Sequence, residues 1–319
     1  MQYSDIKIKA DNILANVNKV IIGHADVTKL VITALIAGGN VLLEDVPGTG
    51  KTVLAKSLAK SMDSTFSRIQ FTPDLLPSDV TGINYFNQKQ GEFIFKKGPV
   101  FTNILLADEI NRATPRTQSS LLECMEEKQV SVDGVTTKLE SPFFVIATQN
   151  PVETAGTFPL PQAQLDRFMM KLEMGFPDAE DEISIIDRFN GENPLVNLTG
   201  VCTSDELCEM QQLISDAFIH PSLKKYIVDI INATRNNQAV IHGVSPRGTL
   251  AFVRALRSFA SVNGRNYVTP EDVKELAGVV LAHRLVMSSS YGASSSSKKV
   301  IADILKSVPV PTENFSEVK

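Results

Sequence analysis

Gly50-Lys51-Thr52 has the residue types and the order that phosphate binding requires. The run follows Gly48 and Thr49, and this loop separates an apolar segment, Val41–Leu43, from a helix-forming one, Val53–Met62. Glycines permit a tight turn whose backbone N–H groups converge on an anion, and the N-terminus of the next helix points at the same anion. Lys51 would reach the β- and γ-phosphates of a nucleotide, and the Thr52 hydroxyl would bind Mg²⁺.

The strict phosphate-loop pattern fails at one position, where Asp45 replaces its first glycine. Because a carboxylate facing a triphosphate would be repelled, we expect the Asp45 side chain to point away from the loop. An ordinary strand-to-helix loop is the alternative, and the flanking elements disfavour it. The residues expected to contact the nucleotide here are Pro47, Gly48, Thr49, Gly50, Lys51, Thr52 and Val53.

A second cluster, Asp108-Glu109, follows the apolar run Ile104–Ala107 in the manner of a Walker B motif. If this run is a strand of a parallel sheet, both carboxylates lie at the carboxyl edge of the sheet, where ligands of open α/β folds bind. Asp108 would hold Mg²⁺ through water, and Glu109 would polarise the water that attacks the γ-phosphate. A solvated strand end is the alternative, which the phosphate loop upstream disfavours.

A third cluster, Thr148-Gln149-Asn150, ends the apolar run Phe143–Ala147. An amide at this edge can hydrogen-bond the γ-phosphate and hold the attacking water in line. Asn150 precedes Pro151, so an ordinary turn is the alternative. Taken together, the three clusters predict a site that hydrolyses ATP with the help of Mg²⁺.

The elements that must position these clusters differ between the two halves of the chain. Short apolar runs without alternation, separated by helix-like segments, predict an α/β domain with a parallel sheet over residues 1–177. Residues 178–287 carry apolar residues at helical spacing and two capping signals, at Thr203 and Thr269, which predict an all-α domain. Serine-rich residues follow, so we expect a flexible tether and tail over 288–319.

The composition narrows the class of protein further. The 319 residues suffice for two domains, and a hydrophobic content of 43% can fill a sizeable core. A formal net charge of -5 provides no field that would hold a nucleic-acid backbone. Three cysteines without metal-ligand spacing suggest reduced thiols in a cytoplasmic protein. No membrane span is expected, since no apolar run reaches the roughly 18 residues that one needs.

Four motifs resemble, in order and spacing, those of the AAA+ ATPases and more closely those of their MoxR family. The motifs are Leu43–Thr52, Asp108–Ala113, Ala147–Glu153 and Leu160–Phe168. The resemblance implies a P-loop core with a five-stranded parallel sheet of strand order 5-1-4-3-2, flanked by helices and followed by a helical lid. It also implies that the family tolerates Asp45, and it assigns Asn150 as the sensor 1 residue.

The same resemblance implies roles for two arginines and for the segment beside adenine. Arg167 matches the arginine finger, which would reach the γ-phosphate of a neighbouring subunit in a ring, commonly a hexamer; pairing with Asp166 is the structural alternative. Arg247 matches sensor 2, a cis arginine that would couple the nucleotide state to the lid position, and a solvated first helical turn is its alternative. Ile22 and Gly23 match the adenine segment of relatives.

Two further segments predict β-hairpins. Strand-like residues flank positions 88–91, and Asp133-Gly134 is a strong turn signal between Gln129–Val132 and Thr136–Leu139. Their places in the chain resemble the helix-2-insert and pre-sensor-1 hairpins of the branch that contains MoxR proteins and magnesium chelatase motors. In a ring such hairpins would either grip a substrate or only help assembly.

The leading functional hypothesis is a ring-forming ATPase that remodels or matures a partner protein. The MoxR resemblance implies this role, often beside proteins that carry von Willebrand factor A domains. A metal-chelatase-like motor and a nucleotide-dependent assembly switch with slow hydrolysis are the alternatives. An ATPase that works on DNA is disfavoured by the acidic balance and by the lack of an appended DNA-binding motif, so no nucleic-acid partner is expected.

Overall fold

A five-stranded sheet lies at the centre of the computed structural model, which describes residues 1–46, 48–151, 156–191, 193–288 and 296–316. Its strands are Val41–Glu44 (β1), Phe66–Gln70 (β2), Ile104–Asp108 (β5), Phe144–Gln149 (β8) and Met170–Leu172 (β9). They lie in the order β2-β5-β8-β1-β9, and every neighbouring pair is parallel. If these five strands are numbered 1 to 5 along the chain and the sheet is followed from β9 to β2, the order is 5-1-4-3-2. The expected α/β core is therefore confirmed.

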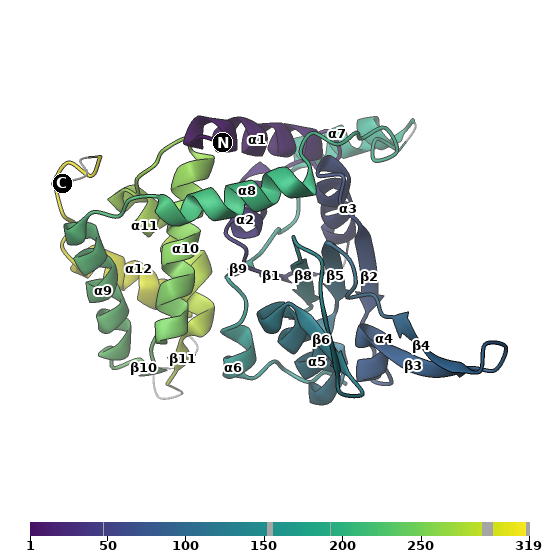
Figure 1. The fold of residues 1–319 in the computed structure, drawn as a ribbon. Coiled ribbons are helices and arrows are strands. Elements are labelled where there is room, and N and C mark those ends of the chain that lie inside the picture. Colours follow the sequence, from purple (N-terminus) through teal and green to yellow (C-terminus); the bar gives the residue numbers. More distant parts are fainter. Residues whose placement is uncertain (47, 152–155, 192, 289–295, 317–319) are drawn as a thin grey trace.

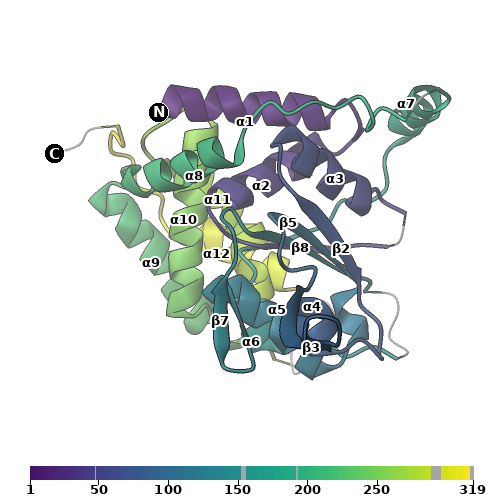
Figure 2. The same cartoon turned by 45° about the vertical axis from the view of Figure 1, so that its right-hand side comes forward.

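The central strands β1, β5 and β8 are buried on both faces, since successive side chains point to opposite sides of the sheet and helices cover both sides. In β5, Ile104 and Leu106 join one apolar cluster, and Leu105 and Ala107 join the other. The first cluster draws on α1 (Tyr3–Val17), α2 (Ala25–Ile36) and α3 (Lys51–Ser61), and the second on α4 (Pro77–Thr81) and α5 (Pro115–Glu127). Figure 1 and Figure 2 show α2 and α3 on one side of the sheet and α4 and α5 on the other.

The second half of the chain folds into helices that begin at capping residues. They are α8 (Ser204–Leu213), α9 (Pro221–Arg235), α10 (Pro246–Val262), α11 (Pro270–Leu281) and α12 (Ser297–Ser307). Thr203 and Glu206 form the expected capping box ahead of α8. Among the described residues, no helix combines the length and the apolar content that crossing a membrane requires.

A small β-ribbon departs from the all-α lid that the sequence predicts. The strand β10 (Val240–His242) pairs antiparallel with β11 (Val286–Met287). Strands of two or three residues are too short to carry a periodic pattern, so the sequence contains no signal for them. The ribbon closes the end of the lid where α9 passes into α10 (Figure 1).

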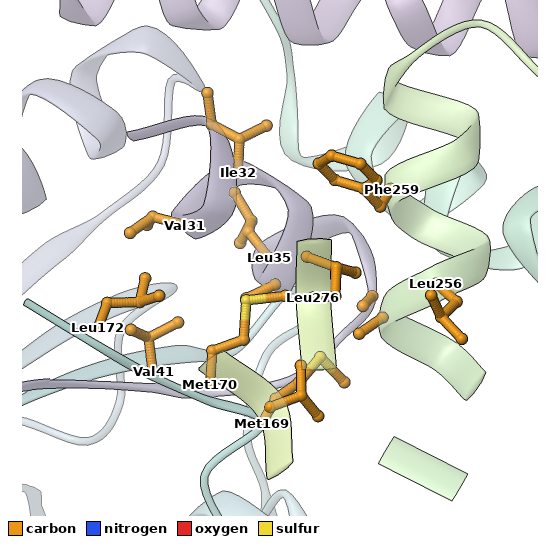
Figure 3. Packing of buried hydrophobic residues seen from close by; sticks show 14 of the residues in the cluster. Val31, Ile32, Leu35, Val41, Met169, Met170, Leu172, Leu256, Phe259 and Leu276 are labelled. Carbon is orange, nitrogen blue, oxygen red and sulfur yellow. The ribbon is translucent and has the colours of Figure 1, made fainter. Parts of the chain in front are cut away.

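One apolar cluster continues from the sheet into the lid helices. Figure 3 shows Ile32 and Leu35 of α2, Met170 of β9, Phe259 of α10 and Leu276 of α11 packed together. Each of these helices is amphipathic and must bury its apolar face against another element. Apolar packing therefore runs across the domain boundary that the sequence analysis expects near residue 177.

The last helix, α12, belongs to the same packed body. Val300, Ile301 and Ile304 are buried at helical spacing, and α12 contacts α9 and α11. The lid thus extends beyond residue 287, where the sequence analysis ended it, because a short amphipathic segment follows the serines. The serine-rich residues 289–295, which were expected to form a tether, lie outside the described residues.

Both expected hairpins form, and they contact each other. Their strands are Gly82–Asn87 (β3) with Glu92–Lys97 (β4), and Gln129–Val132 (β6) with Val135–Lys138 (β7). The Asn84 side-chain amide donates a hydrogen bond of 2.8 Å to Asp133 Oδ2 in the second turn. The β3–β4 hairpin extends away from the body (Figure 1), and it leaves Phe86 and Phe93 exposed.

Replacing Ile301 with alanine tests how far α12 supports the fold. The side chain is 1% exposed, so Ile301→Ala should lower the free energy of unfolding by about 2–5 kcal/mol through lost burial and a residual cavity. Denaturant titration followed by circular dichroism measures this change. Lys299→Ala, at an exposed position of the same helix, is the matched control and should stay within about 0.5 kcal/mol of the parent. Equal stability of the two variants would contradict the packing of α12.

Candidate active site

The phosphate loop connects β1 to α3, as the sequence predicts. Gly48 and Gly50 have φ angles of 91° and 89°, a left-handed backbone conformation that glycine adopts without a Cβ clash. The helix α3 then begins at Lys51, so its N-terminus points into the loop. Pro47, also expected to contact nucleotide, lies outside the described residues.

Lys51 is buried against carbonyl groups of its own loop. It is 9% exposed, and its Nζ donates to the backbone oxygens of Val46 at 2.6 Å and Asp45 at 3.2 Å. Burial lowers the pKa of Lys51, and the nearby carboxylates of Asp45, Asp108 and Glu109 oppose that shift. A phosphate in the loop would compete with the two carbonyls for this ammonium group.

The Asp45 side chain turns toward the segment after β9, as expected for a carboxylate that avoids phosphate. Its Oδ2 accepts hydrogen bonds from the backbone N–H groups of Met174 and Gly175, both at 2.9 Å. Its Oδ1 accepts from the N–H of Val46 at 2.9 Å. The carboxylate therefore ties the phosphate loop to the strand end beside it, a tie that a glycine would remove.

The carboxyl ends of β5 and β8 meet at a cavity of about 390 Å³ beside the loop. The Thr148 hydroxyl donates to Asp108 Oδ1 at 2.6 Å and accepts from the backbone N–H of Glu109 at 2.8 Å, so the two strand ends are joined directly. Asn150 is buried at the same edge. The expected site residues that line this cavity are Gly48, Gly50, Lys51, Thr52, Val53, Asp108, Glu109 and Asn150.

Two side chains of β2, which the sequence analysis missed, hold the acids in place. Arg68 donates to Asp108 Oδ2 from Nε at 3.1 Å and from Nη2 at 2.7 Å. Gln70 Nε2 donates to Glu109 Oε2 at 2.7 Å, and Arg112 Nη1 donates to the same oxygen at 3.1 Å. The sequence signal for Arg68 and Gln70 was that both are polar and lie at alternate positions of one strand. Their hydrogen-bond partners depend on the pairing of β2 with β5, which no local sequence pattern reveals.

The oxygen donors at this edge fit a magnesium ion bound together with phosphate. The Thr52 hydroxyl and the Asp108 carboxylate line one cavity with the loop. Among the described residues, no group of three or more His, Cys, Asp or Glu side chains could hold a metal ion by itself. Mg²⁺ commonly takes one or two protein oxygens and completes its shell with substrate phosphates and water, which agrees with this donor set.

An apolar cavity of about 310 Å³ adjoins the phosphate loop and can accommodate a nucleotide base. Ile22, Thr49 and Val53, which the sequence analysis expects to contact nucleotide, are among the residues that line it. Ile185 and Phe189 complete it from α7 (Ala179–Phe189). These two residues were missed, although their spacing of four positions is that of one helix face.

Gly23 lies beside this cavity and contacts α7 closely. Its φ is 78°, and a Cβ at this position would lie 2.3 Å from the Asp181 carboxylate. The residue thus has to be glycine for both conformational and steric reasons. Its role in the structure is to let α7 approach the segment that carries Ile22.

Arg167 and Arg247 lie together in a second cavity, and neither lines the phosphate cavity. Both pair with Glu126 near the end of α5: Arg167 Nε lies 3.2 Å from Oε2, and Arg247 Nη2 pairs with Oε1. In the lid, α10 packs against α1 and α2, and Arg247 in its first turn contacts α5 through Glu126. Arg247 therefore does not have the expected cis position, and Asp166 pairs with Arg284 rather than with Arg167.

Comparison with known proteins shows similarity over nearly the whole chain. Residues 40–170 match the ATPase family associated with various cellular activities (AAA), and residues 232–304 match the AAA lid domain. The chain is 45% identical to the uncharacterised protein YeaC of Bacillus subtilis, over 93% of each protein. It is 41% identical to chaperone MoxR1 of Mycobacterium tuberculosis, over 93% of this chain and 81% of the relative.

Further relatives agree with this result. Protein MoxR of Paracoccus denitrificans is 30% identical over 87% of this chain and 88% of its own length. A crystal structure of a Cytophaga hutchinsonii protein with a proposed ATPase function superposes with a TM-score of 0.90, at 40% identity and over 97% of each chain. At this identity and coverage, the fold is shared with these proteins.

Asp45→Gly restores the strict loop pattern and tests what the carboxylate does. The change should lower the free energy of unfolding by about 1–3 kcal/mol, because two backbone donors after β9 lose their acceptor. Asp45→Asn keeps an acceptor oxygen at the same place and is expected to lose less. Thermal unfolding by calorimetry compares the variants with the parent. A gain in stability on Asp45→Gly would rule out the proposed tie.

Proposed function

The chain belongs to the MoxR family of AAA+ ATPases, and from this premise we propose that it is a Mg²⁺-dependent ATPase that works in a ring and remodels or matures a partner protein. The proposal rests on the convergence of Lys51, Asp108, Glu109 and Asn150 on one cavity beside the phosphate loop. Phosphoryl transfer needs a cation at the phosphates, a metal ligand and a group that orients water, and these residues can supply each of them. We place the activity in the cytoplasm, where ATP is available.

Within one chain, ATP binding would replace several of the contacts that the site residues now make with other protein groups. Lys51 would exchange the carbonyls of Asp45 and Val46 for the β- and γ-phosphates. Thr52 and Asp108 would hold Mg²⁺, which when bound neutralises charge on the β- and γ-phosphates. Asp108 would then loosen its contacts with Arg68, so nucleotide binding would also reach β2.

Glu109 would act as the group that polarises the attacking water, while the Asn150 amide binds the γ-phosphate. One Glu109 oxygen accepts hydrogen bonds from both Gln70 and Arg112, so the carboxylate is restrained until those bonds loosen. This restraint favours a second candidate function, a nucleotide-dependent assembly switch with slow hydrolysis. In that case the rate would rise when assembly or a client moves Gln70 or Arg112.

The positions of Arg167 and Arg247 support a site shared between subunits. An arginine that stabilises the transferred phosphoryl group must reach the γ-phosphate, yet both residues line another cavity in their own chain. We propose that both leave Glu126 and reach the nucleotide of a neighbour in a hexameric ring. A head-to-tail interface of this kind closes into a ring when its rotation permits.

The proposed client is a protein. The Mycobacterium tuberculosis relative is named a chaperone. In the present chain, the β3–β4 hairpin leaves Ile83, Phe86 and Phe93 at least half exposed, and apolar side chains of this kind can bind a partly folded segment. A protein with a von Willebrand factor A domain is the partner that we propose for this hairpin or for the ring as a whole.

Glu109→Gln separates nucleotide binding from hydrolysis. ATP affinity should stay close to that of the parent, and turnover should fall by about 100- to 10,000-fold because the amide cannot act as a base. Phosphate release and calorimetric binding measure the two quantities. Glu123→Gln, an exposed carboxylate of α5, is the matched control, and Lys51→Ala should lose ATP binding itself. Unchanged turnover of Glu109→Gln would exclude the assigned role.

Mixing two inactive variants tests whether the site is shared. Arg167→Ala alone should lose about 1,000-fold or more of its turnover, as expected for an arginine finger. Mixed with Glu109→Gln subunits, it should regain activity, because an intact Glu109 then faces an intact Arg167 across some interfaces. The control is a chain that carries both changes, which should stay inactive when it is mixed with either single variant at any ratio. Absence of recovery in the mixture of single variants would contradict the shared site.

A further inference from the structure

A three-residue turn of the lid, Ala282–Arg284, binds the segment that carries Arg167. The Arg284 side chain is 1% exposed. Its Nη1 donates to the Asp166 backbone oxygen at 2.7 Å and pairs with the Asp166 carboxylate, and its Nη2 donates to the Phe168 backbone oxygen at 2.6 Å. One guanidinium group therefore binds the residues on both sides of Arg167.

The Asp166 carboxylate extends this contact to the helix that carries Arg247. While its Oδ1 faces Arg284, its Oδ2 accepts a hydrogen bond of 3.0 Å from Ser245 Oγ. Ser245 Oγ in turn accepts from the backbone N–H of Gly248 and so caps the first turn of α10, which contains Arg247. A single ion pair, in which Arg284 is buried, thus links the backbone segments that present both arginines.

His283 adds two contacts to the same segment. Its backbone oxygen accepts from Gln162 Nε2 at 2.9 Å at the start of α6 (Gln162–Leu165), and its Nε2 lies 3.2 Å from the Phe168 backbone oxygen. Burial lowers the pKa of His283 to about 3, so the ring is neutral near pH 7 and its Nε2–H can donate to that oxygen. The lid turn consequently holds both ends of residues 162–168.

We propose that Arg284 is a positioning residue for phosphoryl transfer, which holds Arg167 and Arg247 in one arrangement and makes both move with the lid. This inference rests on the proposed function, in which the two arginines act on the nucleotide of the adjacent subunit. A lid movement driven by nucleotide in one subunit would then shift both cations at the neighbouring site. Such a link matters for rate, because a misplacement of about 1 Å can cost about 100-fold.

The alternative explanation is that Arg284 only stabilises the fold, because removal of one partner of a buried ion pair destabilises a protein. The lid contains a matched pair that serves as a control. Arg265 donates to both carboxylate oxygens of Asp272, at 2.8 and 2.6 Å, and to the backbone oxygen of Tyr267 at 3.0 Å. These bonds stay within the lid, so breaking them should weaken the fold without moving residues 162–168.

The first experiment compares Arg284→Gln with Arg265→Gln, which make the same chemical change in the two pairs. Both variants should unfold at lower temperature than the parent and bind a non-hydrolysable ATP analogue with the parent Kd. Arg284→Gln should lose about 100-fold in turnover, whereas Arg265→Gln should keep it within about twofold. If Arg284→Gln shows no cooperative unfolding, Asp166→Asn, which keeps the backbone acceptors of Arg284, replaces it in every assay. Equal turnover of the two variants would overturn the positioning role.

Subunit mixing separates positioning from folding. An Arg284→Gln subunit retains its own Lys51 and Glu109, so mixing it with Glu109→Gln subunits should restore turnover, with the Arg167→Ala mixture as reference. Recovery with Arg167→Ala but not with Arg284→Gln would overturn the positioning role and leave the proposed function intact. Failure of both mixtures would instead overturn the shared site on which the inference rests.

Discussion

The parallel pairing of β1, β5 and β8 is the constraint on which the rest of the structure depends. Because these strands run in one direction, the loop after β1, the acids at the end of β5 and the amide after β8 meet at one edge of the sheet. Apolar side chains on both faces hold this register, since a slip by one residue would turn each side chain to the opposite face. The position of the site is therefore a consequence of core packing.

The charged groups at this edge are satisfied within the chain. Lys51 binds loop carbonyls, Arg68 binds Asp108, and Gln70 binds Glu109. For Lys51, which is buried, the pairing avoids the free-energy cost of a buried group without a partner. In the function proposed above, an entering nucleotide would compete for these partners, and its binding would be coupled to movement of the loop and of β2.

The apolar cluster that continues from the sheet into the lid fixes the position of the lid and, with it, the position of Arg247. Packing of α10 and α11 against α2 and β9 brings the start of α10 to the end of α5, and Arg247 meets Arg167 on Glu126. Arg284 then joins the lid to the segment beside Arg167 through Asp166. The nucleotide cavity and the two arginines therefore occupy separate places in one chain, an arrangement that suits a site completed by a neighbour.

The sequence by itself determined the features that depend on near neighbours in the chain: the glycine turn before Lys51, the acids at a strand end, the hairpin turn at Asp133 and the helix caps. Residue type and spacing act locally, so they can be interpreted without the fold. Only the tertiary structure decided that Gln70 restrains Glu109, that α12 joins the lid and that Arg247 lies away from the loop. These contacts join segments far apart in the chain, and long-range packing selects them.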